Sequence, residues 1–346
     1  RNHAIVPSPD HRLNQDRQSL TGTVVAKYSL ASILTSDESQ HPTNHISADS
    51  EHNVPGRWKL AIEQSPESLT AAVKETAMLH GADLVGIAPV SRFEGAPAHH
   101  HPRFFMPNAT AVISIGCRIN RAILRTVATG KEHMSYCGFG FIQVNAELDS
   151  IAYHVARYIE RQGYEAYPIA ANAPRDPMFR WGLSHRHAAV AAGLGEMGWG
   201  LNLLTPQFGA KQKLVSVITD APLLGDPLIK HEICDRCYSC VSICPTGALT
   251  KEKMHRFEIE GVSFEHCRQT KWKCSFGCGG LTDKGTFAMT EFALPEERPT
   301  PEQMFSYLAR KNPVQKFLEE EIQNLPWCAK CLAVCALHLD QKYGFA

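Results

Sequence analysis

The fold of the C-terminal third is decided by the stretch Cys234-Asp-Arg-Cys237-Tyr-Ser-Cys240-Val-Ser-Ile-Cys244-Pro245. In this spacing, three closely spaced thiolates wrap three corners of an iron–sulfur cube, and the fourth cysteine, next to the proline, reaches a second cube. Zinc sites rarely use this triple spacing ending in proline. The stretch therefore predicts a bacterial ferredoxin-like arrangement with two [4Fe–4S] clusters.

A second run, Cys328-Ala-Lys-Cys331-Leu-Ala-Val-Cys335, supplies only three of the four cysteines that a symmetrical ferredoxin would have. By the crossing rule for two-cluster ferredoxins, the last cysteine of each run ligates the other run's cluster. The first cluster is then expected to take Cys234, Cys237, Cys240 and Cys335. The second is expected to take Cys244, Cys328, Cys331 and a fourth thiol, for which the candidates are Cys267, Cys274 and Cys278.

The two cysteines outside this region, Cys117 and Cys137, are predicted to be packing residues, because a free cysteine is commonly a small buried hydrophobe. The other ten of the twelve cysteines are crowded between residues 234 and 335, which indicates metal ligands and not disulfides.

Composition excludes several classes of partner. The 346 residues include 35 Lys plus Arg and 35 Asp plus Glu, so the overall charge predicts neither a nucleic-acid nor an acidic-lipid partner. No apolar run approaches the roughly 18 residues that span a bilayer. The sequence starts at Arg1 and not at Met. A removed export signal would place the protein on the periplasmic side of the cytoplasmic membrane, and otherwise we expect it in the cytoplasm.

The chain divides into three parts by composition and hydrophobic periodicity. Residues 1–57 are polar and show little periodicity, which predicts an extension. Residues 58–226 alternate predicted strands and helices and suggest one layered α/β domain. Residues 227–346 carry short cysteine-bearing segments. The expected helices are Ser65–His80, Val144–Arg161, Arg186–Met197 and Pro301–Asn324, and the expected strands are Ala82–Val90, Thr110–Cys117, Glu165–Ala170 and Lys211–Thr219.

Several motifs between residues 75 and 340 resemble a known family. They are Gly81-Ala-Asp-Leu-Val-Gly-Ile87, Gly163-Tyr-Glu-Ala-Tyr-Pro168, Ala192-Gly-Leu-Gly-Glu-Met-Gly198, Leu204-Thr-Pro-Gln-Phe-Gly209 and Thr219-Asp-Ala-Pro-Leu223, followed by the ferredoxin run. This pattern is similar to the corrinoid-dependent reductive dehalogenases, and the epoxyqueuosine reductases share a looser version. The resemblance implies an α+β fold class, with a nitroreductase-like α/β corrinoid-binding domain followed by a two-cluster ferredoxin-like domain.

The resemblance also implies site residues. The context His266-Cys267-Arg-Gln-Thr-Lys-Trp272 favours Cys267 as the fourth ligand of the second cluster. Family members use a tyrosine backed by a basic residue as proton donor, which suggests Tyr136, although Phe141 is an alternative for the aligned place. The expected corrinoid contacts are Asn172, Arg175, Gly193, Leu194, Gly195, Glu196, Trp199 and Thr205.

Some of these positions have simpler interpretations. Trp199 stands where the family has its basic residue. Read without the family, the turn from Gly193 to Gly198 is either a close approach to a ligand or a tight exit from a helix. Asn172 and Arg175 could also be loop-capping residues. His185 or His187 could face the pocket as an acid or simply begin a helix. The run His99-His100-His101 is expected to be a solvated loop.

The first hypothesis is therefore an enzyme that relays electrons through two clusters to cobalamin and removes halide from a small organohalide. It would need a low-potential electron donor and could use a membrane-anchor partner protein. The alternatives are an electron-transfer or corrinoid-binding protein without turnover, and an epoxyqueuosine-reductase-like enzyme.

Overall fold

The computed structural model describes residues 64–172, 182–229, 232–278, 282–284, 293–300, 302–303, 306 and 328–344, which belong to one compact unit. The expected extension over residues 1–57 and Arg175 lie outside the described residues, as does most of the expected helix over Pro301–Asn324. Within the described part, no helix combines the length and the apolar character that a membrane crossing requires.

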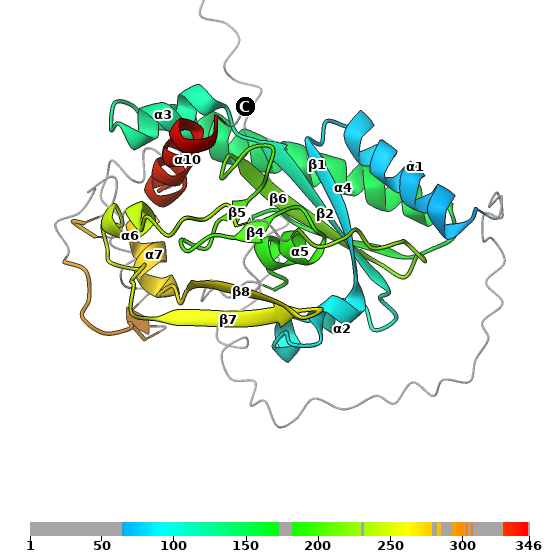
Figure 1. The fold of residues 1–346 in the computed structure, drawn as a ribbon. Helices are drawn as coiled ribbons and strands as arrows, with labels where there is room; N and C mark the ends of the chain where they lie inside the picture. The colour runs from blue at the N-terminus through cyan, green and yellow to red at the C-terminus, as the bar shows by residue number, and fades with distance from the viewer. Residues whose placement is uncertain are drawn as a thin grey trace, which may run out of the picture. The chain divides into compact units, whose positions relative to one another are not determined.

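The centre of the unit is a four-stranded sheet in the order β1-β2-β6-β3 (Figure 1). Its strands are β1 (Leu84–Pro89), β2 (Ala111–Arg118), β6 (Gln212–Thr219) and β3 (Ala166–Ile169), which confirms all four expected strands. Every neighbouring pair is antiparallel. β2 and β3 are consequently parallel to each other, and β6 lies between them. The alternation of strands and helices arises here because a helix links two parallel strands that are not direct neighbours.

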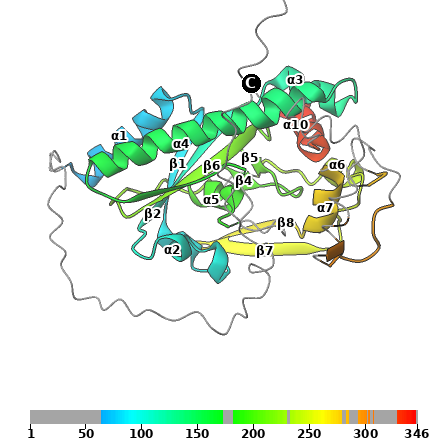
Figure 2. The ribbon, with the colours of Figure 1, turned by 180° about the vertical axis from the view of Figure 1, so that it is seen from behind.

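That helix, α4 (Val144–Arg161), lies beside α1 (Pro66–Leu79) on one face of the sheet (Figure 2). The bounds of α4 agree with its expected helix, and α1 begins where the sequence predicts, because the Ser65 hydroxyl accepts the N–H of Ser68 and a proline occupies the first turn. Alternate strand residues point to this face, so Ile113 and Ile115 pack against the two helices.

The opposite face carries α5 (His185–Ala191). The prediction of a helix over Arg186–Met197 is wrong in its second half. The chain leaves the helix after Ala191, Gly193 adopts a left-handed conformation (φ +70°), and the last residues form a short hairpin instead. The hairpin pairs β4 (Glu196–Met197) with β5 (Leu203–Leu204). The glycines at 193 and 195 carry the signal for this helix end, in agreement with the interpretation of the turn from Gly193 to Gly198 as a tight exit from a helix.

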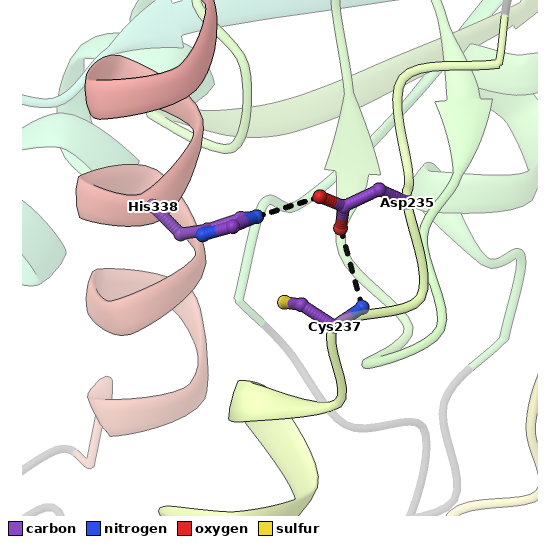
Figure 3. Close-up of side chains that lie close together, drawn as sticks. All are labelled: Asp235, Cys237 and His338. Carbon is purple, nitrogen blue, oxygen red and sulfur yellow. Dashed lines mark hydrogen bonds and ion pairs between the residues drawn. The ribbon is translucent and has the colours of Figure 1, made fainter.

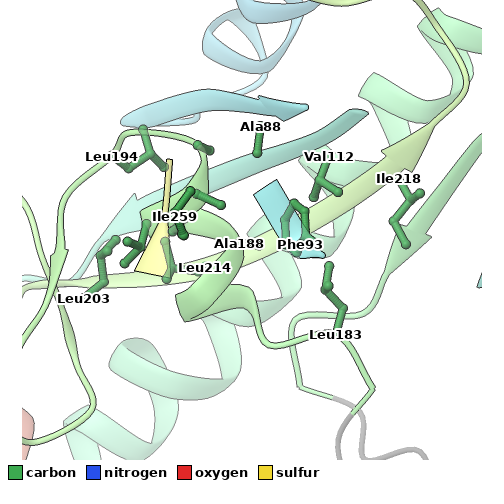
Figure 4. Close-up of a cluster of buried hydrophobic side chains, with 14 of the residues drawn as sticks. Ala88, Phe93, Val112, Leu183, Ala188, Leu194, Leu203, Leu214, Ile218 and Ile259 are labelled. Carbon is green, nitrogen blue, oxygen red and sulfur yellow. The ribbon is translucent and has the colours of Figure 1, made fainter. Parts of the chain in front are cut away.

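The cysteine-bearing part contains a hairpin that sequence analysis missed. It pairs β7 (Met254–Ile259) with β8 (Val262–Cys267), and Ile259 and Phe264 pack in the same hydrophobic cluster as α5 (Figure 4). Many residues of these strands are polar and face outward, so the sequence does not show the apolar pattern that predicts a strand. The remaining elements are η2 (Val90–Phe93), η3 (Ala98–His100), α2 (Pro102–Phe105), α3 (Arg121–Ala128), η4 (Tyr136–Gln143), α6 (Ser239–Ser242), α7 (Lys271–Cys278) and α10 (Lys330–Tyr343).

Helix α10 brings the second cysteine run to the first. Its buried residues Ala333, Ala336 and Leu339 pack in one cluster with Leu124 and Val127 of α3. A fully buried Lys211 forms an ion pair with Asp340 of α10. A buried charge needs a counter-charge, so this ion pair favours the docked position of α10.

The substitution Asp340→Asn is expected to destabilise the protein by about 3–5 kcal/mol, because it removes the carboxylate charge that pairs with the buried ammonium group of Lys211. Anaerobic chemical unfolding measures the change. The double variant Lys211→Met/Asp340→Leu removes both charges and should recover most of the stability. A single variant that unfolds like the wild type would show that the ion pair does not hold α10.

Candidate functional site

Four of the predicted ligand thiols meet in one pocket. Cys234, Cys237, Cys240 and Cys335 all line it, although the last comes from α10, about a hundred residues further along the chain. Cys237 is exposed, Cys240 is buried, and the other two are half-buried. This set of sulfurs, called here the first thiol set, is the one that the spacing predicts for the first cluster.

The backbone between these cysteines is bent to curl around the pocket. Arg236 (φ +54°) and Tyr238 (φ +58°) both adopt the left-handed conformation, which costs free energy in residues other than glycine. The start of the run is fixed by Glu196, whose Oε1 accepts the N–H groups of Ile233 (2.8 Å) and Cys234 (2.5 Å). Such local strain is typical of a chain that wraps a ligand.

Asp235 ties the run to α10 (Figure 3). Its Oδ2 lies 2.8 Å from His338 Nε2 and 2.7 Å from Lys342 Nζ, and its Oδ1 accepts the N–H of Cys237. Asp235, Cys237 and His338 together could also bind a single metal ion by the proximity of their ligand atoms. Because the carboxylate already has three donors, we assign it to holding α10 in place.

The predicted ligands of the second cluster also lie close together, and we call them the second thiol set. Cys267 is fully buried, and its Sγ accepts the N–H of Thr250 at 3.2 Å. Cys331 lies within electrostatic reach of other thiols, which include Cys328 and Cys244 and which raise its pKa. Cys278 lies beside the same set, because its Sγ contacts the carbonyl of Cys328 at 3.7 Å.

The chemistry of these thiols fits iron. Burial raises the pKa of Cys240 to about 11 and that of Cys331 to about 12, and it raises the pKa of Cys335 well above its usual value. Neighbouring thiols raise these values further, so thiolates would be unfavourable here without a cation beside them. Iron ions supply that positive charge, and thiolates are their ligands in iron–sulfur clusters.

Cys117 has the environment predicted for a packing residue. It lies in the cluster between the sheet and helices α1 and α4, and burial raises its pKa to about 12. Cys137 is also buried.

The glycines predicted to approach a corrinoid are needed for packing within the protein. A Cβ on Gly193 would lie 2.1 Å from the carbonyl oxygen of Pro227, and a Cβ on Gly195 would lie 2.1 Å from that of Leu204. These distances exclude any side chain. The turn is therefore the tight helix exit that was the simpler interpretation, although Gly193 and Leu194 also line an open pocket of about 550 Å³.

The other predicted corrinoid contacts also have protein partners. Thr205 is buried, and its hydroxyl accepts the N–H of Phe208 in a turn. Trp199 lies in the first thiol pocket, where its N–H donates to Cys234 Sγ at 3.4 Å and its indole Nε1 donates to the carbonyl of Thr250. Glu196 holds the cysteine run, as described above. Asn172 is half-buried at the end of the segment that follows β3.

Tyr136 lies at the start of η4, a π-helical turn of the kind that is frequent at functional sites. It is 2% exposed, and burial raises its pKa well above the ordinary value for tyrosine. A Cβ on Gly140 would lie 2.5 Å from the Tyr136 ring, so this glycine makes room for it. The thiols of Cys278 and Cys331 are among the groups that act on the phenol electrostatically, which places Tyr136 beside the second thiol set.

Sequence analysis missed the basic residue of this site. Lys213 of β6 lies with its Nζ 4.1 Å from the centroid of the Phe141 ring and 5.8 Å from that of Tyr136. Burial lowers the pKa of Lys213 to about 8, and Arg186, whose own pKa burial also lowers, acts in the same direction. A lysine inside an otherwise apolar predicted strand was the available signal. We call Tyr136, Lys213 and Arg186 the buried polar site.

The histidines have structural partners. His185 Nδ1 lies 2.9 Å from the Ser216 hydroxyl, and its Nε2 lies 3.1 Å from the carbonyl of Ala170. Burial lowers its pKa to about 4, and burial together with His266 lowers that of His187 to about 3, so both are neutral near pH 7. In the run over residues 99–101, His101 caps α2 by accepting the N–H of Arg103.

The substitution Cys335→Ser is expected to lower the iron content from roughly eight to roughly four atoms per chain, because one cube loses a ligand. Iron and sulfide assays on anaerobically purified protein measure it. Cys117→Ala, which removes a buried thiol outside both sets, is the matched control and should keep all of the iron. Equal iron in Cys335→Ser and the wild type would contradict the ligand assignment.

The comparisons with known proteins point to the same chemistry. Residues 227–250 match the family model described as a 4Fe-4S binding domain. The tetrachloroethene reductive dehalogenase of Dehalobacter restrictus is 24% identical over 261 residues, which cover 61% of this chain and 43% of that protein. The epoxyqueuosine reductase of Bacillus cereus is 29% identical over 154 residues, which cover 43% of this chain and 38% of that protein.

A solved reductive dehalogenase structure superposes with a TM-score of 0.48 and 19% identity, over 78% of this chain and 36% of the other. The chain spans less than half the length of the curated dehalogenases that it matches.

Proposed function

We propose that this chain, a relative of the reductive dehalogenases and the epoxyqueuosine reductases, is an oxidoreductase that relays electrons through two [4Fe–4S] clusters to a buried site of reduction. The observation that carries the proposal is the gathering of Cys234, Cys237, Cys240 and Cys335 in one pocket. Cys331 of the second thiol set lies within electrostatic reach of Cys240.

The burial of the thiols supports a direction for the electrons. Cys237 is the exposed thiol of the first set, so a low-potential donor can approach the first cluster there. The second set has no exposed thiol, since Cys267 is buried and the other three are half-buried. Cys331 of this set acts electrostatically on Cys240 of the first and on Lys213 of the buried polar site. Electrons would therefore pass from the surface to the first cluster, then to the second, and then to the buried polar site.

The buried polar site supports protonation of a product. In reductive dehalogenation, a carbon–halogen bond breaks, two electrons and one proton are taken up, and a carbon–hydrogen bond and a halide ion result. The Tyr136 phenol can donate that proton, and the nearby ammonium group of Lys213 stabilises the phenolate that remains. The protein thus supplies an acid and a positive charge in a desolvated place.

The proposal extends to a nitroreductase-like corrinoid domain and to a small organohalide as substrate, as the family resemblance implies. A corrinoid would supply the low-potential, two-electron reduction of the carbon–halogen bond. Among the described residues, Gly193 and Leu194 line a pocket, whereas Glu196, Trp199 and Thr205 are engaged within the protein. These partners favour the second candidate function, electron transfer without turnover of a halide.

The test is anaerobic purification with free cobalamin present, followed by iron and cobalt analysis and by turnover assays with chlorinated ethenes and halophenols. We expect about eight iron atoms per chain and release of halide with a reduced donor. Iron without cobalt or halide release would favour the electron-transfer protein. Reduction of epoxyqueuosine in tRNA, without halide release, would favour the third alternative.

The substitution Tyr136→Phe is expected to lower turnover by about 10²–10⁴-fold, because it removes the proton donor but keeps the ring that packs on Gly140. Halide release measures the change, and the iron content should stay at the wild-type value. The matched control is Tyr153→Phe, since Tyr153 is 55% exposed on α4. Turnover that is equal in Tyr136→Phe and the wild type would exclude this phenol as the acid.

A further inference from the structure

One buried hydrogen-bond donor points into the first thiol pocket. The side-chain nitrogen Nδ2 of Asn202 is inaccessible to water and has no hydrogen-bond partner among the residues that the structure describes. The same residue lines the pocket of Cys234, Cys237, Cys240 and Cys335. An amide group left unpaired in the interior lowers the stability of the folded protein, so it needs an explanation.

The loop that carries Asn202 is pressed against one of the thiols. It connects β4 to β5 and runs from Gly198 to Asn202. A Cβ on Gly200 would lie 3.0 Å from Cys240 Sγ and 3.7 Å from Asn202 Nδ2. Gly200 therefore lets the loop approach the cysteine closely, and the sulfur and the amide nitrogen both lie within 4 Å of the position that a Cβ would take.

The backbone fixes the loop in this position. The N–H of Gly198 donates to the carbonyl of Asn202 at 2.9 Å, and the carbonyl of Leu201, a residue in the left-handed conformation (φ +62°), accepts a hydrogen bond from Arg186 at 2.7 Å. The amide group is thus held where it is by contacts that do not use its nitrogen. An oxygen in place of that nitrogen would face electron-rich sulfur and be repelled.

We propose that Asn202 Nδ2 donates a hydrogen bond to a sulfur of the first [4Fe–4S] cluster and raises the reduction potential of that cluster. This inference rests on the proposed iron–sulfur function. The cysteine sulfurs do not take the donor, which leaves the inorganic sulfide of the cube as its acceptor. Reduction adds negative charge to the cube, so an N–H···S bond stabilises the reduced form more than the oxidised form. The first cluster then accepts electrons from the donor more readily.

The experiment is a redox titration of the anaerobic protein followed by electron paramagnetic resonance. The first-cluster signal is the one that Cys335→Ser removes. Asn202→Leu keeps a side chain of similar size without the donor, and we expect a more negative midpoint potential for that signal alone. Asn202→Asp replaces the donor by a negative charge and should shift the potential further in the same direction.

The matched control is Thr246→Val. Thr246 is also buried, and its hydroxyl lies 3.9 Å from Cys244 Sγ of the second thiol set. This variant should leave the first-cluster potential unchanged. If it shifts that potential as much as Asn202→Leu does, or if Asn202→Leu shifts nothing, the proposal is overturned.

A second measurement uses the wild-type protein, so its result does not depend on whether a variant folds. Among the residues that line the pocket, Asn202 supplies the sole asparagine side chain. Wild-type protein labelled with ¹⁵N in its asparagine amides should show a ¹⁵N coupling to the reduced first cluster in pulsed spectra. Spectra with clusters but without that coupling overturn the inference and leave the proposed function intact, whereas a chain without iron overturns both.

Discussion

The ion pair between Lys211 and Asp340 is the constraint on which the metal-binding half depends. The first thiol set is complete only when α10 lies against the core, because Cys335 comes from that helix. The apolar contacts between α10 and α3 bury hydrophobic surface, but such contacts do not depend strongly on orientation. The ion pair does, because the buried ammonium group of Lys211 needs the carboxylate of Asp340 at one place. At the other side of the helix, Asp235 receives His338 and Lys342 and so fixes the cysteine run to the same element.

Around the thiols, ligands take the place of an ordinary core. The smallest hydrophobic cluster consists of Trp199, Leu249 and cysteines, with further cysteines at its edge. So few apolar side chains bury little area, and the raised pKa values of the thiols oppose the thiolate form. Binding of iron would compensate for both the small apolar core and the unfavourable thiolates, since the metal links the segments and neutralises the negative charges. Folding of this half and cluster binding are therefore coupled.

The sequence predicts those features that are local in the chain. Helix α4 and the four strands of the sheet follow from periodicity, and Cys234, Cys237 and Cys240 follow from cysteine spacing, because both patterns are formed by neighbouring residues. Cys335 is added to them by the crossing rule for two-cluster ferredoxins. The glycines after α5 indicate a tight exit from the helix, but the sequence does not show what requires it, namely the close approach of Gly193 to the carbonyl of Pro227. The roles of Lys213 and Asn202 are not predictable for a similar reason. Lys213 is notable as a lysine in an apolar strand, and Asn202 is an asparagine in a turn, but the residues that give each its role are brought to it only by the fold.

The placement of positive charge completes the electron route. Lys213 and Arg186 are half-buried, and desolvation lowers the pKa of each, so their charged forms need negative charge nearby. The second thiol set is the nearby source, because Cys331 acts on both residues and raises their pKa values. A reduced cluster carries more negative charge than an oxidised one, and the two cations therefore favour an electron on the second cluster. The exposed first cluster and Asn202 would govern how electrons enter, whereas these cations would draw them inward to Tyr136.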